Sequence, residues 1–197
     1  MSTTTLPLFP LHCVLFPGGR LDLRLFEPRY LDMLSRCMRE GSGFGVCLIK
    51  EGREAGAPAL PYDVGTVVEI SDWQAGEDGV LAITVLGHRR FRILSRQVER
   101  DRLLRAEVAL LEETPAAPVP PPLLTALRDL WENAFPAGDT TDSDWPAHDA
   151  TLLLARLADW TPLDAAQKQY LLQLNDPMVR LERLVGMWRA RQDDGGV

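Results

Sequence analysis

The chain has 197 residues, of which 46% are hydrophobic and 25% charged, and its net charge is −7. This balance is typical of a globular protein rather than of an intrinsically disordered chain. The acidic total disfavours nonspecific binding of nucleic acid, because neutralising phosphates requires a basic surface. No apolar run approaches the roughly 20 residues of a membrane span, and the apolar start lacks the basic residues of a signal peptide, so we expect no membrane segment.

The three cysteines, Cys13, Cys37 and Cys47, are widely spaced and odd in number. They form no C-x-x-C pair and no cysteine–histidine spacing typical of a zinc site. We therefore expect no metal site and three buried thiols that behave as small hydrophobic residues. This cysteine usage fits a reducing environment, and we expect a cytoplasmic location.

The first part of the chain, residues 1–114, is predicted to consist mainly of β-strands. Leu21, Leu23 and Leu25 alternate with polar residues, which is the pattern of a half-buried strand. Further strands are predicted at 44–49, 64–73, 80–87 and 104–110. Several strands with short connections predict a closed or nearly closed antiparallel β-barrel.

One helix is predicted between these strands. Pro28 suits its first position and Gly41 suits the position after its last turn. Its apolar stripe is predicted to consist of Tyr30, Leu31, Leu34 and Met38. The fold class is therefore α+β, with one helix inserted into the barrel.

A proline-rich run at 115–122 predicts a linker, because proline lacks the backbone donor that strands and helix interiors need. After it, at 123–197, apolar residues recur with the helical period and predict a bundle of four amphipathic helices. Thr161 is the predicted N-cap of the third helix, with Tyr170 and Leu171 on its apolar face, and Pro177 opens the fourth.

No motif for catalysis or cofactor binding is present in the sequence. It contains no G-x-x-x-x-G-K-[S/T] phosphate loop, no G-x-S-x-G, no H-E-x-x-H and no EF-hand loop. The three histidines, His12, His88 and His148, do not cluster in the sequence. We therefore predict no catalytic residue, no cofactor and no metal ligand.

Five segments in order carry a resemblance to a known family. They are LPLFPLHCVLFPGGRLDLRLFEPRYLDML (6–34), FGVCLI (44–49), DVGTVVEI (63–70), GHRRFRI (87–93) and AEVALLEE (106–113). Together they resemble the N-terminal domain family of Lon protease, the part of Lon that recognises substrates. The resemblance implies a PUA-like β-barrel followed by helices, used for binding rather than for catalysis. No motif of the Lon ATPase or peptidase accompanies it.

Three residues at the start of the predicted helix are candidates for a binding surface. Glu27 and Arg29 flank Pro28, and Tyr30 follows. A carboxylate here favours the positive end of the helix dipole, and Arg29 can bridge to the barrel. A purely structural role for all three is the alternative.

A basic segment departs from the acidic total. Residues 88–105 hold seven arginines, and strand alternation places Arg90 and Arg92 on one face, with Phe91 facing the core. One interpretation is a solvated hairpin face. The other is a docking stripe for an acidic partner or RNA, although RNA readers usually pair basic residues with exposed aromatic ones.

The polar, acidic segment 136–149 is long for a connection between helices. Its Trp145 is either a lid over a gap in the bundle or an exposed anchor for a partner, since tryptophan is common at interface hot spots.

The leading hypothesis is a non-catalytic module that binds unfolded or partner polypeptide. The binding region would be a groove between barrel and bundle or the open edge of the barrel. One alternative is RNA or nucleotide binding through Arg90 and Arg92. Another is an enzyme of unknown type that uses the cleft between barrel and bundle. The sequence leaves the oligomeric state open, with a homo-oligomer among the states it allows.

Overall fold

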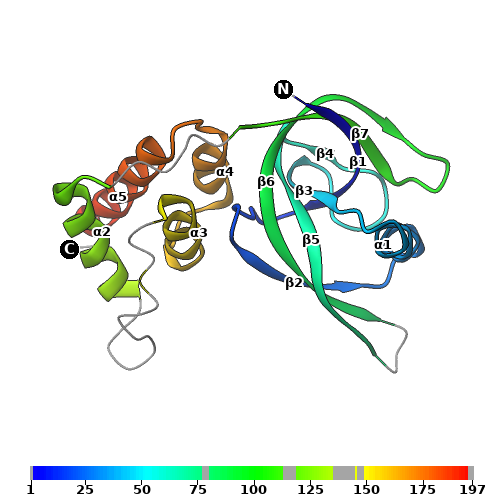
Figure 1. The fold of residues 1–197 in the computed structure, drawn as a ribbon, viewed down its shortest axis with the longest axis horizontal. Helices are drawn as coiled ribbons and strands as arrows, with labels where there is room; N and C mark the ends of the chain where they lie inside the picture. Colours follow the sequence, from blue (N-terminus) through cyan, green and yellow to red (C-terminus); the bar gives the residue numbers. More distant parts are fainter. Residues whose placement is uncertain (1, 77–79, 113–118, 135–144, 146–148, 195–197) are drawn as a thin grey trace. The chain divides into compact units, whose positions relative to one another are not determined.

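The computed structural model describes residues 2–76, 80–112, 119–134, 145 and 149–194. The chain divides into two compact units, Met1–Glu112 and Glu113–Val197. The described residues form a mixed fold with a largely antiparallel sheet and five helices (Figure 1). The first half of the predicted linker, 115–118, lies outside the described residues.

The first unit contains seven strands and one helix in its described part. They are β1 (Thr3–Leu11), β2 (Arg20–Leu25), α1 (Pro28–Glu40), β3 (Phe44–Glu51), β4 (Leu60–Pro61), β5 (Val64–Ala75), β6 (Leu81–Val98) and β7 (Leu104–Leu110). The strand order is β1–β7–β6–β5–β3–β4, and β2 pairs with β6. Because β1 also pairs with β3, the pairings close into a ring of five strands.

The predicted antiparallel arrangement has one exception, since β1 and β3 run parallel. The other pairs of the ring are antiparallel. A ring with an odd number of strands cannot alternate direction at every pair. At least one parallel pair is therefore a geometric consequence of closing the ring with five strands.

Apolar side chains of these strands fill two buried clusters. The larger cluster joins α1 to β1, β2, β3, β5 and β6, and the smaller one joins β1, β3, β6 and β7. Leu23 and Leu25 are buried, which confirms the half-buried strand, and Phe91 is fully buried as predicted. Gly45 and Gly65 make room for that ring, because a Cβ on either would lie 2.7 Å from Phe91 Cζ.

Helix α1 begins at Pro28 and ends at Glu40; the next residue, Gly41, caps it with a left-handed φ of 60° and donates its N–H to the Cys37 carbonyl. Both limits agree with the sequence prediction. Met38, predicted on the buried stripe, is instead exposed. The buried face is formed by Tyr30, Met33, Leu34 and Cys37. This set follows the i, i+3, i+4, i+7 spacing of a single helix face, and Met38 lies about 100° beyond its last member.

The second unit contains α2 (Pro121–Ala134), α3 (Ala150–Trp160), α4 (Ala165–Gln173) and α5 (Pro177–Asp194). Helix α5 contacts the three others, and the buried residues are mainly leucines. Helix α2 begins inside the range predicted as linker, which is compatible with prolines in a first helical turn. No helix in the described residues is long and apolar enough to cross a membrane.

Two predictions for this unit are wrong in detail. The N-cap of α4 is Asp164 rather than Thr161, and Asp164 forms a reciprocal capping box with Gln167. Tyr170 is exposed, whereas Leu171, which was predicted on the same apolar face, is buried together with Leu172. The helix starts three residues later than predicted, because the carboxylate of Asp164 accepts a hydrogen bond from the free backbone N–H of Gln167.

The cysteines differ in their surroundings. Cys37 and Cys47 are buried as predicted, and burial raises the pKa of both thiols. Cys13, which lies in the connection after β1, is exposed, contrary to the prediction.

Candidate functional site

The connection between β2 and α1 holds a compact polar cluster. Arg29 is buried, and its Nη2 lies 3.0 Å from Glu27 Oε2. Its guanidinium carbon lies 4.6 Å from the centre of the Tyr30 ring, and its Nη1 donates to the Arg102 carbonyl at 3.1 Å. The Glu27 side chain makes no capping hydrogen bond at the start of α1. The cluster therefore ties the beginning of the helix to the turn between β6 and β7.

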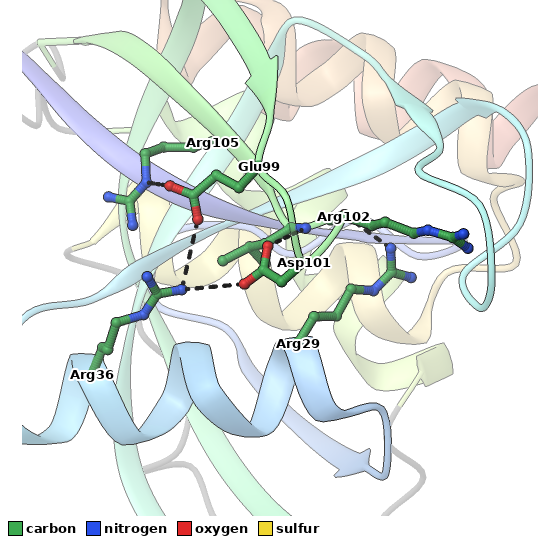
Figure 2. A network of polar contacts seen from close by, with 7 residues as sticks. Arg29, Arg36, Glu99, Asp101, Arg102 and Arg105 are labelled. Carbon is green, nitrogen blue, oxygen red and sulfur yellow. Dashed lines mark hydrogen bonds and ion pairs between the residues drawn. The ribbon is translucent and has the colours of Figure 1, made fainter.

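The same turn also contacts α1 about two helical turns further along. Figure 2 shows Arg36 of α1 pointing toward Glu99 and Asp101, at 3.8 and 3.9 Å. Glu99 also accepts a hydrogen bond of 2.7 Å from Arg105 Nε on β7. Arg102 adopts a left-handed φ of 67° within this turn. These contacts fix α1 against the sheet and so fix the position of Tyr30.

A pocket of about 200 Å³ opens on the other side of this cluster, within the first unit. Its apolar lining comes from β1, β2 and α1 and consists of Phe9, Leu11, Leu23, Leu25 and Tyr30, together with Phe26 and Ala55. The rings of Phe9 and Tyr30 meet edge to face, with their centres 4.3 Å apart. Phe26 is 64% exposed at the edge of the pocket. The pocket thus combines a fixed apolar floor with an exposed aromatic ring.

The charged lining of the pocket is acidic. Asp22, Glu27 and Glu54 contribute three carboxylates and Arg24 one cation, which gives a net charge of −2. Asp22 accepts from the Thr84 hydroxyl at 2.6 Å, and Glu54 accepts from the backbone N–H of His12 at 2.6 Å. Each carboxylate is therefore held in place.

Burial raises the pKa of Tyr30 to about 12, with a smaller lowering by Arg29 and further raising by Glu27 and Glu54. The phenol therefore stays protonated near neutral pH. It can donate or accept a hydrogen bond, but it is a poor proton acceptor in catalysis.

The pocket brings together two of the predicted candidates, Glu27 and Tyr30, with Arg29 next to them. Sequence reasoning missed Phe26 and Glu54. Phe26 could have been found, because it is an aromatic residue between a strand and a helix and belongs to the apolar pattern of neither. No sequence pattern indicates Glu54, because it lies in a polar segment distant in sequence from β2.

Arg90 and Arg92 do not form the predicted exposed stripe. Arg90 is fully buried and Arg92 is exposed. The partner of Arg90 on β5 is Thr66, whose hydroxyl donates to the Leu15 carbonyl at 2.5 Å. Opposite residues of an antiparallel pair share a face. The segment around Leu15 therefore covers the side of the sheet from which Arg90 projects, and alternation alone could not reveal this.

Trp145 lies in the second unit, partly buried against α2. Its ring meets that of Trp131 edge to face with centres 5.2 Å apart, and the Arg128 guanidinium lies 5.6 Å from it. Most of the segment 136–149 around it lies outside the described residues. Trp145 does not line the pocket of the first unit.

The remaining described residues give less indication of a functional site. A hollow of about 700 Å³ beside α1 is lined by residues that include Arg36 and Asp101, which are already engaged in the ion pairs with the turn. Across the part of the chain that the structure describes, no group of three histidine, cysteine or acidic side chains is placed to hold a metal ion.

The chain is similar to several proteins of known sequence or structure. The crystal structure of the Lon N-terminal domain protein from Xanthomonas campestris matches with a TM-score of 0.76 and 39% identity, over 93% of this chain and 98% of that one. The N-terminal domain of Mycobacterium avium complex Lon protease matches with a TM-score of 0.74 over 95% and 98%; at 20% identity it shows the fold alone.

Among curated proteins, Lon protease from Parabacteroides distasonis is 30% identical over 112 residues, which are 56% of this chain and 14% of that protein. Cereblon from Gallus gallus is 28% identical over 116 residues, 57% of this chain and 25% of that protein. The chain thus matches a quarter or less of the length of these two relatives. The sequence also matches, over residues 5–188, the family described as the substrate-binding domain of ATP-dependent protease La (Lon). The chain therefore belongs to the Lon substrate-binding domain family.

Proposed function

We propose that this protein is a non-catalytic polypeptide-binding module. The observation that carries the proposal is the match to a substrate-binding domain over residues 5–188. We also propose that residues 1–114 form a PUA-like barrel, 115–122 a linker and 123–197 a helical bundle. The closed ring of strand pairings and the division into two units support this organisation. A cytoplasmic location is part of the proposal and is supported by the cysteine usage.

We place the binding site in the pocket beside β2 and the start of α1. Its floor is apolar, and its position is fixed by the buried cluster around Arg29. Phe26, with 64% of its surface exposed, presents the kind of side chain that commonly anchors a protein partner. Glu27 and Tyr30 are the proposed binding residues already predicted from the sequence.

The chemistry of the pocket favours recognition over catalysis. Glu27 forms an ion pair with Arg29. Asp22 and Glu54 each accept a hydrogen bond, and the pKa of Tyr30 is raised. A general base needs an accessible group whose pKa lies near the working pH. Burial of Arg90 removes half of the stripe on which RNA binding depended, so that alternative gains no support.

The experiment is a fluorescence-anisotropy titration with labelled ribonuclease A, reduced and carbamidomethylated so that it remains unfolded. Native ribonuclease A has the same composition and serves as the ligand control. We expect binding of the unfolded form alone. Phe26→Ser should weaken it by about five- to tenfold, because the exposed ring is lost.

Trp73→Ser is the matched control variant, because Trp73 is also exposed, at 54%, but does not line the pocket. It should bind as the unmodified protein does. If the unfolded form does not bind at high micromolar concentration, the proposed function is wrong. If the two variants weaken binding equally, the site is misplaced.

A further inference from the structure

The lining of the pocket contains an unbroken run along the chain. Residues 22–27 all contribute, and the first four of them belong to β2. Successive side chains of a strand point to opposite faces, so a pocket over one face would be lined by alternate residues only. A consecutive run is expected where a pocket follows the edge of β2, whose inward residues Leu23 and Leu25 are buried and whose outward residues Asp22 and Arg24 are exposed.

The second edge of β2 supports this reading. Among the described strands β2 pairs with β6 alone, in an antiparallel register from Arg20 opposite Leu86 to Leu25 opposite Leu81. On its far side β6 continues to β5. Strand β2 is therefore the outer member at this place, and an edge strand offers backbone groups that can pair with an added chain.

The remaining walls specify what such a chain would carry. Phe9 and Leu11 of β1 supply buried apolar surface, and Phe26 extends it at the end of β2. The charged lining itself has a net charge of −2, and two of its carboxylates, Glu27 and Asp22, form ion pairs with Arg29 and Arg20 beside it. An extended segment that alternates apolar and basic residues matches both features, because its apolar side chains would face the floor and its cations the acidic rim.

Building on the proposed function, we propose that the bound polypeptide adds to the outer edge of β2 as an extended strand with apolar and basic side chains. Main-chain hydrogen bonds would then supply affinity independent of sequence, and the pocket would select the side chains. This mode suits a module that accepts many unfolded chains, since every unfolded segment carries the same backbone groups.

The probes are fluorescein-labelled octapeptides of alternating lysine and valine, measured by anisotropy. Two of them carry N-methyl groups on alternate residues, one peptide on the lysines and the other on the valines. In an added strand only one of these sets points its N–H groups toward β2. We expect one methylated peptide to lose at least about tenfold in affinity and the other to bind nearly as the parent does, because methylation removes several hydrogen bonds at once.

The charge component is tested with an octapeptide of alternating glutamate and valine. It should bind roughly fivefold or more weakly at low salt, and the difference should shrink as ionic strength rises. Glu54→Gln should reduce the preference for lysine by about two- to threefold. Glu40→Gln is the control, since Glu40 is exposed on α1 and does not line the pocket.

Hydrogen exchange of the unmodified protein provides a readout that needs no variant: amides of residues 20–25 should gain protection when the lysine–valine peptide binds. Strand addition is overturned if the two methylated peptides bind with equal affinity. It is also overturned if the parent peptide does not bind at about 1 mM although unfolded ribonuclease A does. Either result leaves the proposed function standing. If unfolded ribonuclease A fails as well, the proposed function itself fails.

Discussion

Arg29 is expected to contribute strongly to the stability of the first unit. Its side chain is 6% exposed, and that of its ion-pair partner Glu27 is 21% exposed. Replacing Arg29 by alanine leaves the Glu27 carboxylate without its cation and the Arg102 carbonyl without its donor at 3.1 Å. Breaking a fully buried pair costs about 3–5 kcal/mol, and the partial exposure of Glu27 lowers our expectation to about 2–4 kcal/mol.

The matched control is Arg20→Ala. Arg20 lies 3.6 Å from Asp22, and their side chains are 66% and 74% exposed. Because water and salt screen such a pair, its loss should cost less than about 1 kcal/mol. A double-mutant cycle with Glu27→Gln isolates the part of the Arg29 effect that comes from the ion pair.

The assay is guanidinium chloride denaturation followed by circular dichroism, with hydrogen exchange used to assign the loss to residues 1–112. We expect faster exchange in α1 and in the β6–β7 turn, which Arg29 connects. The reasoning is refuted if Arg29→Ala costs less than about 1 kcal/mol, the range of an exposed pair, or if Arg20→Ala costs as much.

Two further predictions concern packing and thiol chemistry. Gly45→Ala should lower the free energy of unfolding by about 1–3 kcal/mol, because its Cβ would lie 2.7 Å from buried side-chain atoms. The Cβ of Gly186→Ala in α5 meets nothing within 4 Å, so this substitution should raise the free energy of unfolding by up to about 1 kcal/mol. Thermal denaturation of both variants tests this, and equal effects would contradict it. Iodoacetamide near neutral pH should modify Cys13 and spare Cys47 in the folded protein, because Cys13 is exposed and burial raises the pKa of the Cys47 thiol, so its reactive thiolate is scarce. Mass spectrometry locates the label, and alkylation of Cys47 at the rate of Cys13 would show that its surroundings open readily.

The sequence determined the features that depend on neighbouring residues. Pro28 and Gly41 limit α1 where predicted, since helix ends are set by backbone geometry and capping within a few residues. Leu23 and Leu25 face inward because strand alternation is a local property. Phe91 likewise lies in the core. The family was also readable from the sequence, because several such local patterns occur together in one order.

Only the tertiary structure decided which distant segments meet. Closing a ring of five strands imposed the parallel β1–β3 pair. The segment around Leu15, 75 positions from Arg90 along the chain, covers the side of the sheet from which that arginine projects. Glu54 joins Asp22 and Glu27 at the pocket, although nothing in its local sequence indicates this. Such contacts depend on chain closure and on burial against remote residues, and the periodicity of a single strand or helix contains no information about either.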